Sequence, residues 1–156
     1  MLRTCILSAA ALGLATGAAA AEEQELRFTL VITPVEEAPL PAAAEGQAVQ
    51  ASRSVGVATF EDGRTAFKEF VFLEAGDEES GELTGYSTYT FEDGDALHVK
   101  FTGGWSPDGL GGDYEVVSGT GAFADATGTG RFDAIGDSWE RAMLLDGSFN
   151  LEVPDS

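Results

Sequence analysis

One stretch constrains the fold of this chain more than any other: YEVVSGTGAFADATGTGRF, from Tyr114 to Phe132. It opens with aromatic and β-branched residues in alternation, a pattern that suits a half-buried strand. A glycine cluster interrupts this pattern, and strand character returns after Gly130. Glycine is favoured where the backbone needs a positive φ angle or a close approach. The stretch therefore predicts two strands joined by one compact turn.

The residues of this turn have separate predicted tasks. Thr120 is placed to cap a single helical turn over 121–126, because a threonine hydroxyl accepts amide hydrogen bonds where helices begin. Phe123 is the one large side chain of the turn and is predicted to plug an apolar core. A plain strand connector and a glycine-rich ligand cradle are both open at this stage. The structural motif consists of Gly119, Thr120, Gly121, Phe123 and Gly128.

The first 21 residues have the composition of a secretory signal peptide. Arg3 supplies a positive start, an apolar run covers 6–20, and small residues at 18–21 suit cleavage before Glu22. The apolar run is short for a membrane span, which needs ~20 residues. We therefore expect a mature domain over 22–156 that is secreted or periplasmic and is not embedded in a membrane.

The charge of the chain is strongly negative, with 27 acidic residues, eight basic residues and a net charge of −19. Cleavage removes Arg3 and no acidic residue, which leaves seven basic residues and a charge of −20. Such a surface repels nucleic acid and anionic lipid, so neither is an expected partner. Cys5 is the one cysteine and leaves with the signal peptide. The mature domain must therefore be stabilised by its core without disulfides.

Short strand-like segments follow one another along the mature chain. Phe-Glu-Asp-Gly occurs at 60–63 and again at 91–94, and Asp-Gly between strand-like residues favours a two-residue type I′ hairpin turn. We therefore expect 55–61 to pair with 64–74, and 85–92 to pair with 95–103. Pro- and Ala-rich residues over 34–54 predict a long loop, which is either disordered and draped on the surface or a lid over a cavity. The remaining strands are predicted over 26–33, 112–118, 129–136 and 142–153.

The expected number of strands is eight. Consecutive antiparallel strands hide all their edges when they close on themselves, which predicts an all-β fold with a single closed eight-stranded antiparallel β-barrel. At this size the interior is filled by side chains or holds one small ligand.

The opening stretch also resembles a known family. Residues 116–123, VVSGTGAF, followed by Ala126 and Gly128, are similar to the V-V-G-G-T-G-x-F-x-x-A-x-G signature of dirigent proteins. Allene oxide cyclases share this barrel and similar glycine-rich segments. The resemblance covers about 89–132. It implies an eight-stranded barrel with a central cavity, often assembled as a trimer, and no particular reaction.

Candidate functional residues lie in the two predicted hairpins. A two-residue turn at 62–63 places Glu69 on an apolar face with Phe67. If this face belongs to the core, a carboxylate there is costly unless paired and suits acid–base chemistry. If the face is outward, Glu69 is solvated. In the second hairpin one face carries Tyr89, His98 and Lys100. If the opposite face, with 97, 99 and 101, forms the core, His98 and Lys100 lie outside. If not, they line the cavity. The weak catalytic candidates are Glu69, His98 and Lys100, and the ligand-binding candidates are Phe67, Tyr89 and Trp105.

No metal or cofactor is expected, because the chain has one histidine, no mature cysteine and no calcium-loop spacing. Three functions remain open. The first is a secreted barrel that binds a small hydrophobic ligand without turnover. The second is a cyclase- or isomerase-type enzyme that acts in the same cavity. The third is a non-catalytic barrel whose outer surface forms a homo-oligomer.

Overall fold

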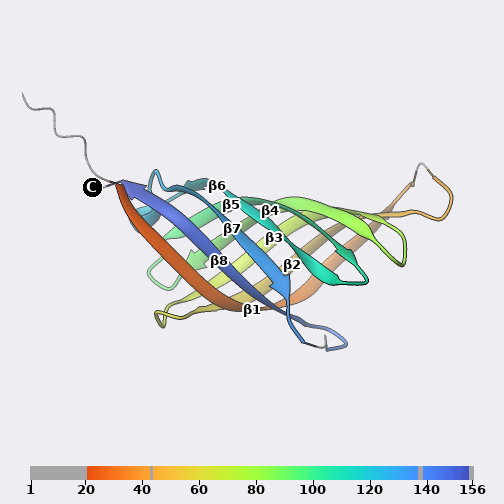
Figure 1. Cartoon of the computed structure of the whole chain (residues 1–156), viewed down its shortest axis with the longest axis horizontal. Helices are drawn as coiled ribbons and strands as arrows, with labels where there is room; N and C mark the ends of the chain where they lie inside the picture. Colours follow the sequence, from red (N-terminus) through yellow and green to blue (C-terminus); the bar gives the residue numbers. More distant parts are fainter. Residues whose placement is uncertain (1–20, 43, 137–138, 155–156) are drawn as a thin grey trace, which may run out of the picture.

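A computed structural model describes residues 21–42, 44–136 and 139–154, so the predicted signal peptide, apart from Ala21, lies outside the described residues. The chain forms one closed antiparallel barrel in which each strand pairs with its sequence neighbours and the first pairs with the last (Figure 1), as predicted. One 3-10 turn, Gly121–Phe123, interrupts the strands. The strands are β1 Ala21–Leu40, β2 Ala48–Phe60, β3 Thr65–Gly76, β4 Gly81–Phe91, β5 Ala96–Ser106, β6 Gly109–Gly119, β7 Thr127–Ala134 and β8 Met143–Pro154.

In the part of the chain that the structure describes, no helix has the length and apolar character needed to cross a membrane.

The predicted loop over 34–54 is wrong, because most of it is strand. β1 and β2 stay paired from Phe28 opposite Phe60 to Leu40 opposite Val49, with one irregularity between Pro34 and Glu36. The pairing of β1 with β8 reaches only to Ile32. Beyond that point β1 is an edge strand, and edge strands tolerate proline because its missing N–H faces no partner. The β1–β2 hairpin therefore projects from one end of the barrel (Figure 1).

The two Asp-Gly hairpins form as predicted, but their turns are one residue longer. Thr59 pairs with Thr65, so the loop contains three residues between Phe60 and Arg64. Only the glycine has a positive φ, 90° at Gly63, whereas a type I′ turn needs positive φ at both central residues. The second hairpin repeats this geometry, with a φ of 92° at Gly94.

This extra residue reverses the predicted faces, because a register shift of one moves every side chain of a strand to the other side. In β3, Lys68 and Phe70 point inward, so the face with Phe67 and Glu69 is the outer one and Glu69 is solvated, one of the two alternatives that the sequence left open. In the second hairpin Tyr89 faces inward beside Leu97, so the predicted grouping of Tyr89 with His98 is wrong.

Aromatic rings fill the barrel interior, and glycines on neighbouring strands make room for them. A Cβ atom added at Gly130 would lie 2.7 Å from Phe149 Cδ1, and one at Gly112 would lie 2.7 Å from Phe132 Cζ. Alternation of large and small inward residues is how small barrels accommodate their side chains. The buried aromatic residues are Phe28, Phe60, Phe70, Tyr89, Phe91, Phe101, Tyr114, Phe123, Phe132 and Phe149.

The glycine-rich turn closes one end of this core. Phe123 is buried, and its ring centroid lies 4.8 Å from that of Phe91, which confirms its predicted role as a plug. The predicted cap at Thr120 is wrong, because its hydroxyl accepts a hydrogen bond from the Ala96 amide at 3.0 Å. Asp95 instead accepts a hydrogen bond from the Ala122 amide at 2.8 Å. The turn is therefore fastened to the start of β5.

Candidate functional site

The most unusual group of the interior is a lysine. Lys68 follows Ala66 and precedes Phe70 on the inward face of β3, and only 2% of it is exposed. Its Nζ atom lies 3.0 Å from the hydroxyl oxygen of Tyr114 on β6. Tyr89 on β4 donates a hydrogen bond to the same oxygen at 3.0 Å. Three strands thus bring one amine and two phenols together inside the barrel.

Aromatic rings surround the Lys68 amine. Nζ lies 4.4 Å from the ring centroid of Phe70, 5.1 Å from those of Tyr89 and Tyr114, and 5.5 Å from that of Phe101. The ion pairs formed within the described residues do not include Lys68. Ring faces attract a cation but replace only part of its hydration.

This environment disfavours the charged form of the amine. Burial lowers the pKa of Lys68 to about 7 from the ordinary 10.5. Burial also raises the pKa of Tyr89 and Tyr114 well above the ordinary value, so both phenols keep their protons at neutral pH. A neutral amine can accept the Tyr114 proton while Tyr114 accepts that of Tyr89. Both hydroxyl protons then have an acceptor, which a charged Lys68 would not provide for Tyr114.

The three catalytic candidates lie on the outside of the barrel. Glu69 forms an ion pair with Arg53 at 3.1 Å between Oε1 and Nη2. His98 Nδ1 lies 3.0 Å from the hydroxyl of Thr88, which stands opposite Glu69 on β4. Lys100 is half-buried on the outer face of β5. Of the two arrangements left open by the sequence, the one with His98 and Lys100 outside is correct.

The three ligand-binding candidates are separated. Tyr89 is fully buried beside Lys68, and Phe67 is 46% exposed on the outer surface. Trp105 lies at the end of β5, where its ring covers Gly76 and Gly81. Its indole N–H donates to the Asp77 carbonyl at 3.3 Å. Only Tyr89 therefore contributes to the interior group.

Sequence reasoning missed Lys68 because the turn length was misjudged. With a three-residue turn, positions 66, 68 and 70 share the face of Phe60. The available signal was the hairpin sequence itself, since a single positive-φ glycine ending a three-residue loop is a common alternative to the two-residue turn.

A second candidate region is the outer surface of the first four strands, here called the β1–β4 wall. It is defined by its exposed large hydrophobic side chains, which are 41–58% accessible. Val31 stands opposite Val57 and Val57 opposite Phe67, while Val71 stands opposite Tyr86. The members of the β1–β4 wall are Val31, Val35, Leu40, Val57, Phe67, Val71, Leu73 and Tyr86.

The β1–β4 wall contains a groove, and its two central strands carry little charge. The groove has a volume of about 530 Å³, and Val71, Leu73 and Tyr86 contribute to its lining. At the outward positions of β2 and β3, two strands described in full, Arg53 and Glu69 are the only charged residues. They pair with each other, so their charges cancel.

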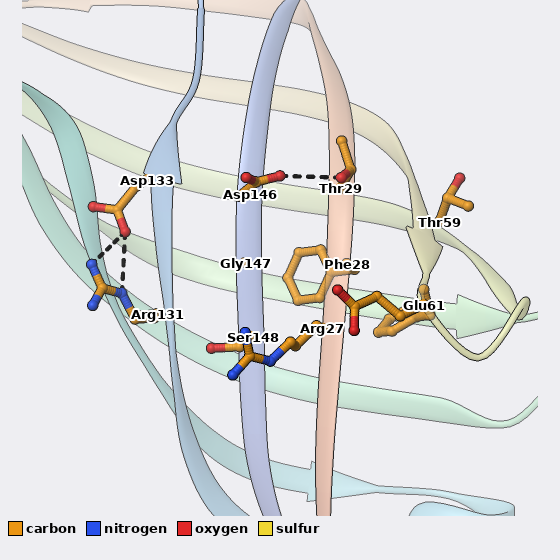
Figure 2. Close-up of a pocket in the computed structure, with 11 residues that line it drawn as sticks. Arg27, Phe28, Thr29, Thr59, Glu61, Arg131, Asp133, Asp146, Gly147 and Ser148 are labelled. Atoms are coloured by element: carbon orange, nitrogen blue, oxygen red, sulfur yellow. Dashed lines mark hydrogen bonds and ion pairs between the residues drawn. The ribbon is translucent and has the colours of Figure 1, made fainter.

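The surface over β7, β8 and β1 has the opposite character (Figure 2). A groove of about 680 Å³ there is lined by charged and hydroxyl side chains. Arg131 is paired with Asp133 on its own strand, and Thr29 donates to Asp146 at 3.1 Å. Arg27 is paired with Glu25. Because each arginine already has a carboxylate partner, an anionic ligand would have to compete for it.

Within the described ranges, no three His, Cys, Asp or Glu side chains come together in a way that would hold a metal ion.

Comparison with known proteins identifies the fold. No protein-family model matches the sequence, and no curated protein matches it. Among solved structures, the pterocarpan synthase dirigent protein GePTS1 superposes with a TM-score of 0.64 over 95% of this chain and 100% of that chain, at 14% identity. A second pterocarpan synthase dirigent protein, PsPTS1, gives 0.61 over 86% and 97%, also at 14% identity. The chain has the barrel fold of dirigent proteins, and at this identity the likeness concerns the fold alone.

Proposed function

We propose that this chain is a non-catalytic barrel that self-associates through the β1–β4 wall. One observation carries the proposal. Eight of the ten large hydrophobic side chains found exposed among the described residues belong to this wall. Monomeric proteins rarely expose a contiguous apolar patch of this kind, and such patches mark interaction sites.

Charge favours a second copy of the chain as the occupant. Each copy has a net charge of −19, so most of its surface repels another copy. At the outward positions of β2 and β3 the charges of Arg53 and Glu69 cancel, and the further acids Glu36 and Glu82 lie on the flanking strands. The centre of the β1–β4 wall therefore repels a second copy less than the rest of the surface does. The interior supports the same role, because a barrel filled by its own side chains is a rigid scaffold. The dirigent resemblance implies three copies.

A small hydrophobic ligand is the second candidate occupant. The groove of about 530 Å³ on the wall is within the ~300–1,000 Å³ usual for small-molecule sites. This candidate moves the expected ligand from the barrel interior, which side chains fill, to the outer surface. An enzyme that acts in the interior through Glu69, His98 and Lys100 receives no support, since all three face outward.

The test compares two valines of similar exposure. Val71 is 54% exposed on the β1–β4 wall, and Val117 is 57% exposed on β6 outside it. The mature chain and the variants Val71→Asp and Val117→Asp are measured by light scattering and native mass spectrometry. We expect assembly in the wild type and in Val117→Asp, and single copies in Val71→Asp. A wild type that stays single but carries a bound small molecule would favour the ligand, and equal effects of both variants would contradict both proposals.

We also propose that the chain is exported, on the strength of its N-terminal composition. The expected result is a mature protein outside the cytosol whose first residue is Glu22. Sequencing the N-terminus of protein recovered from each cell fraction tests this. Recovery of the full-length chain from the cytosol alone would contradict it.

A further inference from the structure

The chain has two lysines, and the barrel places them in opposite environments. Lys68 lies inside among aromatic rings, and Lys100 lies on the outer face of β5, opposite Tyr86 and Glu115. Amines in apolar surroundings are better nucleophiles at neutral pH, because less of the amine carries a proton. The two lysines therefore form a natural comparison within one molecule.

The interior around Lys68 is not lined uniformly. Phe70, the next inward residue of β3, stands between Ser54 on β2 and Ser87 on β4. Phe72 stands between Ser52 and Gly85. Both rings thus have small neighbours on β2 and β4, and they also pack against each other and against Phe101.

The inward residues of β3 lead from Glu74 to the Lys68 amine. The rings of Phe70 and Phe72 are stacked with centroids 5.4 Å apart, and Phe72 is only partly buried. Next along the same face of β3 is Glu74, which accepts hydrogen bonds from Gln50 and Ser52. Phe72 and Phe70 therefore stand between Glu74 and Lys68 along the inward face of β3.

One polar atom beside this route lacks a partner. Ser87 is 3% exposed, and its hydroxyl has no hydrogen-bonding partner. It lies two residues from Tyr89 on the same inward face of β4. A buried hydroxyl without a partner is costly, and it is satisfied when a ligand brings an acceptor.

From this arrangement we propose that Lys68 is a covalent binding site for a small hydrophobic aldehyde, which enters past Phe72 and forms an imine with the amine. The amine nitrogen attacks the carbonyl carbon and a C–N bond forms. The carbonyl oxygen then leaves as water with the two amine protons, and a C=N bond remains. No oxidant or reductant is consumed. The rings of Phe70 and Phe72 rotate to make room for the apolar part of the aldehyde in the otherwise filled interior. Ser87 and Tyr114 then offer hydroxyl donors to the carbonyl oxygen as it reacts.

The experiment uses the mature chain, hexanal as the probe and cyanoborohydride to trap the imine as a stable secondary amine. Intact mass and peptide mapping then report where the added group sits. We expect Lys68 to be labelled at least tenfold faster than Lys100 in folded protein at pH 7.5, and this preference to disappear in urea. Labelling of Lys100 and the N-terminus with Lys68 unmodified, or of Lys68 only in urea, overturns the proposal.

Variants of the route sharpen the test without removing the lysine. Phe72→Ala removes one of the two rings that stand on the route and should speed labelling of Lys68 several-fold. Val117→Ala, a change of an exposed valine on β6 outside both the route and the β1–β4 wall, should leave the rate unchanged. Equal rates in wild type and Phe72→Ala would overturn the proposed route. Labelling is read within one chain, so its outcome is independent of whether copies associate through the β1–β4 wall.

Discussion

The barrel interior and the β1–β4 wall share strands β1 to β4 and are both apolar, yet only the interior is shielded from water. In β3, Phe70 is 6% exposed inside the barrel, and Val71, the next residue, is 54% exposed outside. An antiparallel strand with one face in a core ordinarily has a polar outer face. β3 is apolar on both faces, apart from the ionisable side chains of Lys68 inside and Glu69 outside.

The buried interior stabilises the fold, whereas the exposed wall is available to bind another molecule. Inside, aromatic rings meet one another and glycines, so little apolar surface is left to cover. Outside, the β1–β4 wall leaves large side chains in water, where covering them would be favourable by roughly 25 cal/mol per Å². We therefore place the interaction function on the wall, and the chemical reactivity at the buried amine of Lys68.

The largest expected effect is on the pH dependence of stability, through Lys68. The pKa of Lys68 is about 7 in the folded barrel, and the ordinary value of 10.5 applies in the unfolded chain. Between pH 7 and 10 the unfolded chain therefore holds a proton that the folded chain lacks. The free energy of unfolding then rises with pH by roughly 1.4 kcal/mol per unit, about 4 kcal/mol in all. Below pH 7 the folded and unfolded chains both hold the proton, so the free-energy cost of burying the charged amine no longer changes with pH.

Urea unfolding of the wild type and of Lys68→Met at several pH values measures this effect. The facing titratable groups, Tyr89 and Tyr114, are present in both proteins, so their contributions cancel in the difference. We expect Lys68→Met to be the more stable protein at pH 7 and its advantage to shrink towards pH 10. A difference that does not change with pH would show that Lys68 is charged in the folded barrel.

The next effect tests how tightly the interior is filled. Gly147 lies against the ring of Phe28, and a side chain there would enter the space of that ring. Gly147→Leu should reduce the free energy of unfolding by about 3 kcal/mol, at the upper end of usual overpacking costs. Ser148→Leu, the adjacent outward change, should have little effect in the same thermal unfolding experiment. Equal stability of Gly147→Leu and the wild type would reveal unfilled space inside the barrel.

A smaller effect is expected at the β1–β4 wall, and on association rather than on folding. Phe67 is 46% exposed in the single chain, and covering the rest of its ring contributes about 2 kcal/mol. Phe67→Ser should therefore weaken assembly about thirtyfold in sedimentation experiments, with little change in thermal stability. A large loss of stability with unchanged assembly would place Phe67 in the core instead of the interface.

The smallest effect is expected for the ion pair of the wall. The side chains of Arg53 and Glu69 are 46% and 54% exposed, and exposed pairs of this kind contribute little to stability. Arg53→Ala should change the free energy of unfolding by less than about 0.5 kcal/mol. It leaves Glu69 without its partner, so assembly should become weaker at low salt and recover at high salt. Assembly that does not depend on salt in this variant would argue against charge balance as a feature of the wall.

The sequence predicted the fold because the strand pattern and its turns are local. Phe123 could be identified as a core plug because it is the one large side chain between glycines, and the eight strands could be counted from turn signals. The continuation of strand through Pro34 could not be recognised, since whether an edge strand tolerates proline depends on where β8 stops pairing with β1.

The candidate site was less predictable, for a physical reason. One residue of turn length at Gly63 decides whether Lys68 or Glu69 faces the core, and the Asp-Gly signal fits both turns. The partnership of Lys68 with Tyr114 joins β3 to β6 across the barrel, a contact that no local pattern encodes. The β1–β4 wall was hidden as well, because Val35 and Leu40 fell in the predicted loop and the orientation of the face with Phe67 was left open.

The central claim is that the β1–β4 wall is covered by further copies of this chain. The most direct measurement is the mass of the mature wild-type protein in solution, followed by light scattering across a dilution series. The account predicts an integral multiple of the single-chain mass, with three copies implied by the family resemblance, and dissociation to single chains on dilution or in Val71→Asp. A single-chain mass at every concentration would contradict it.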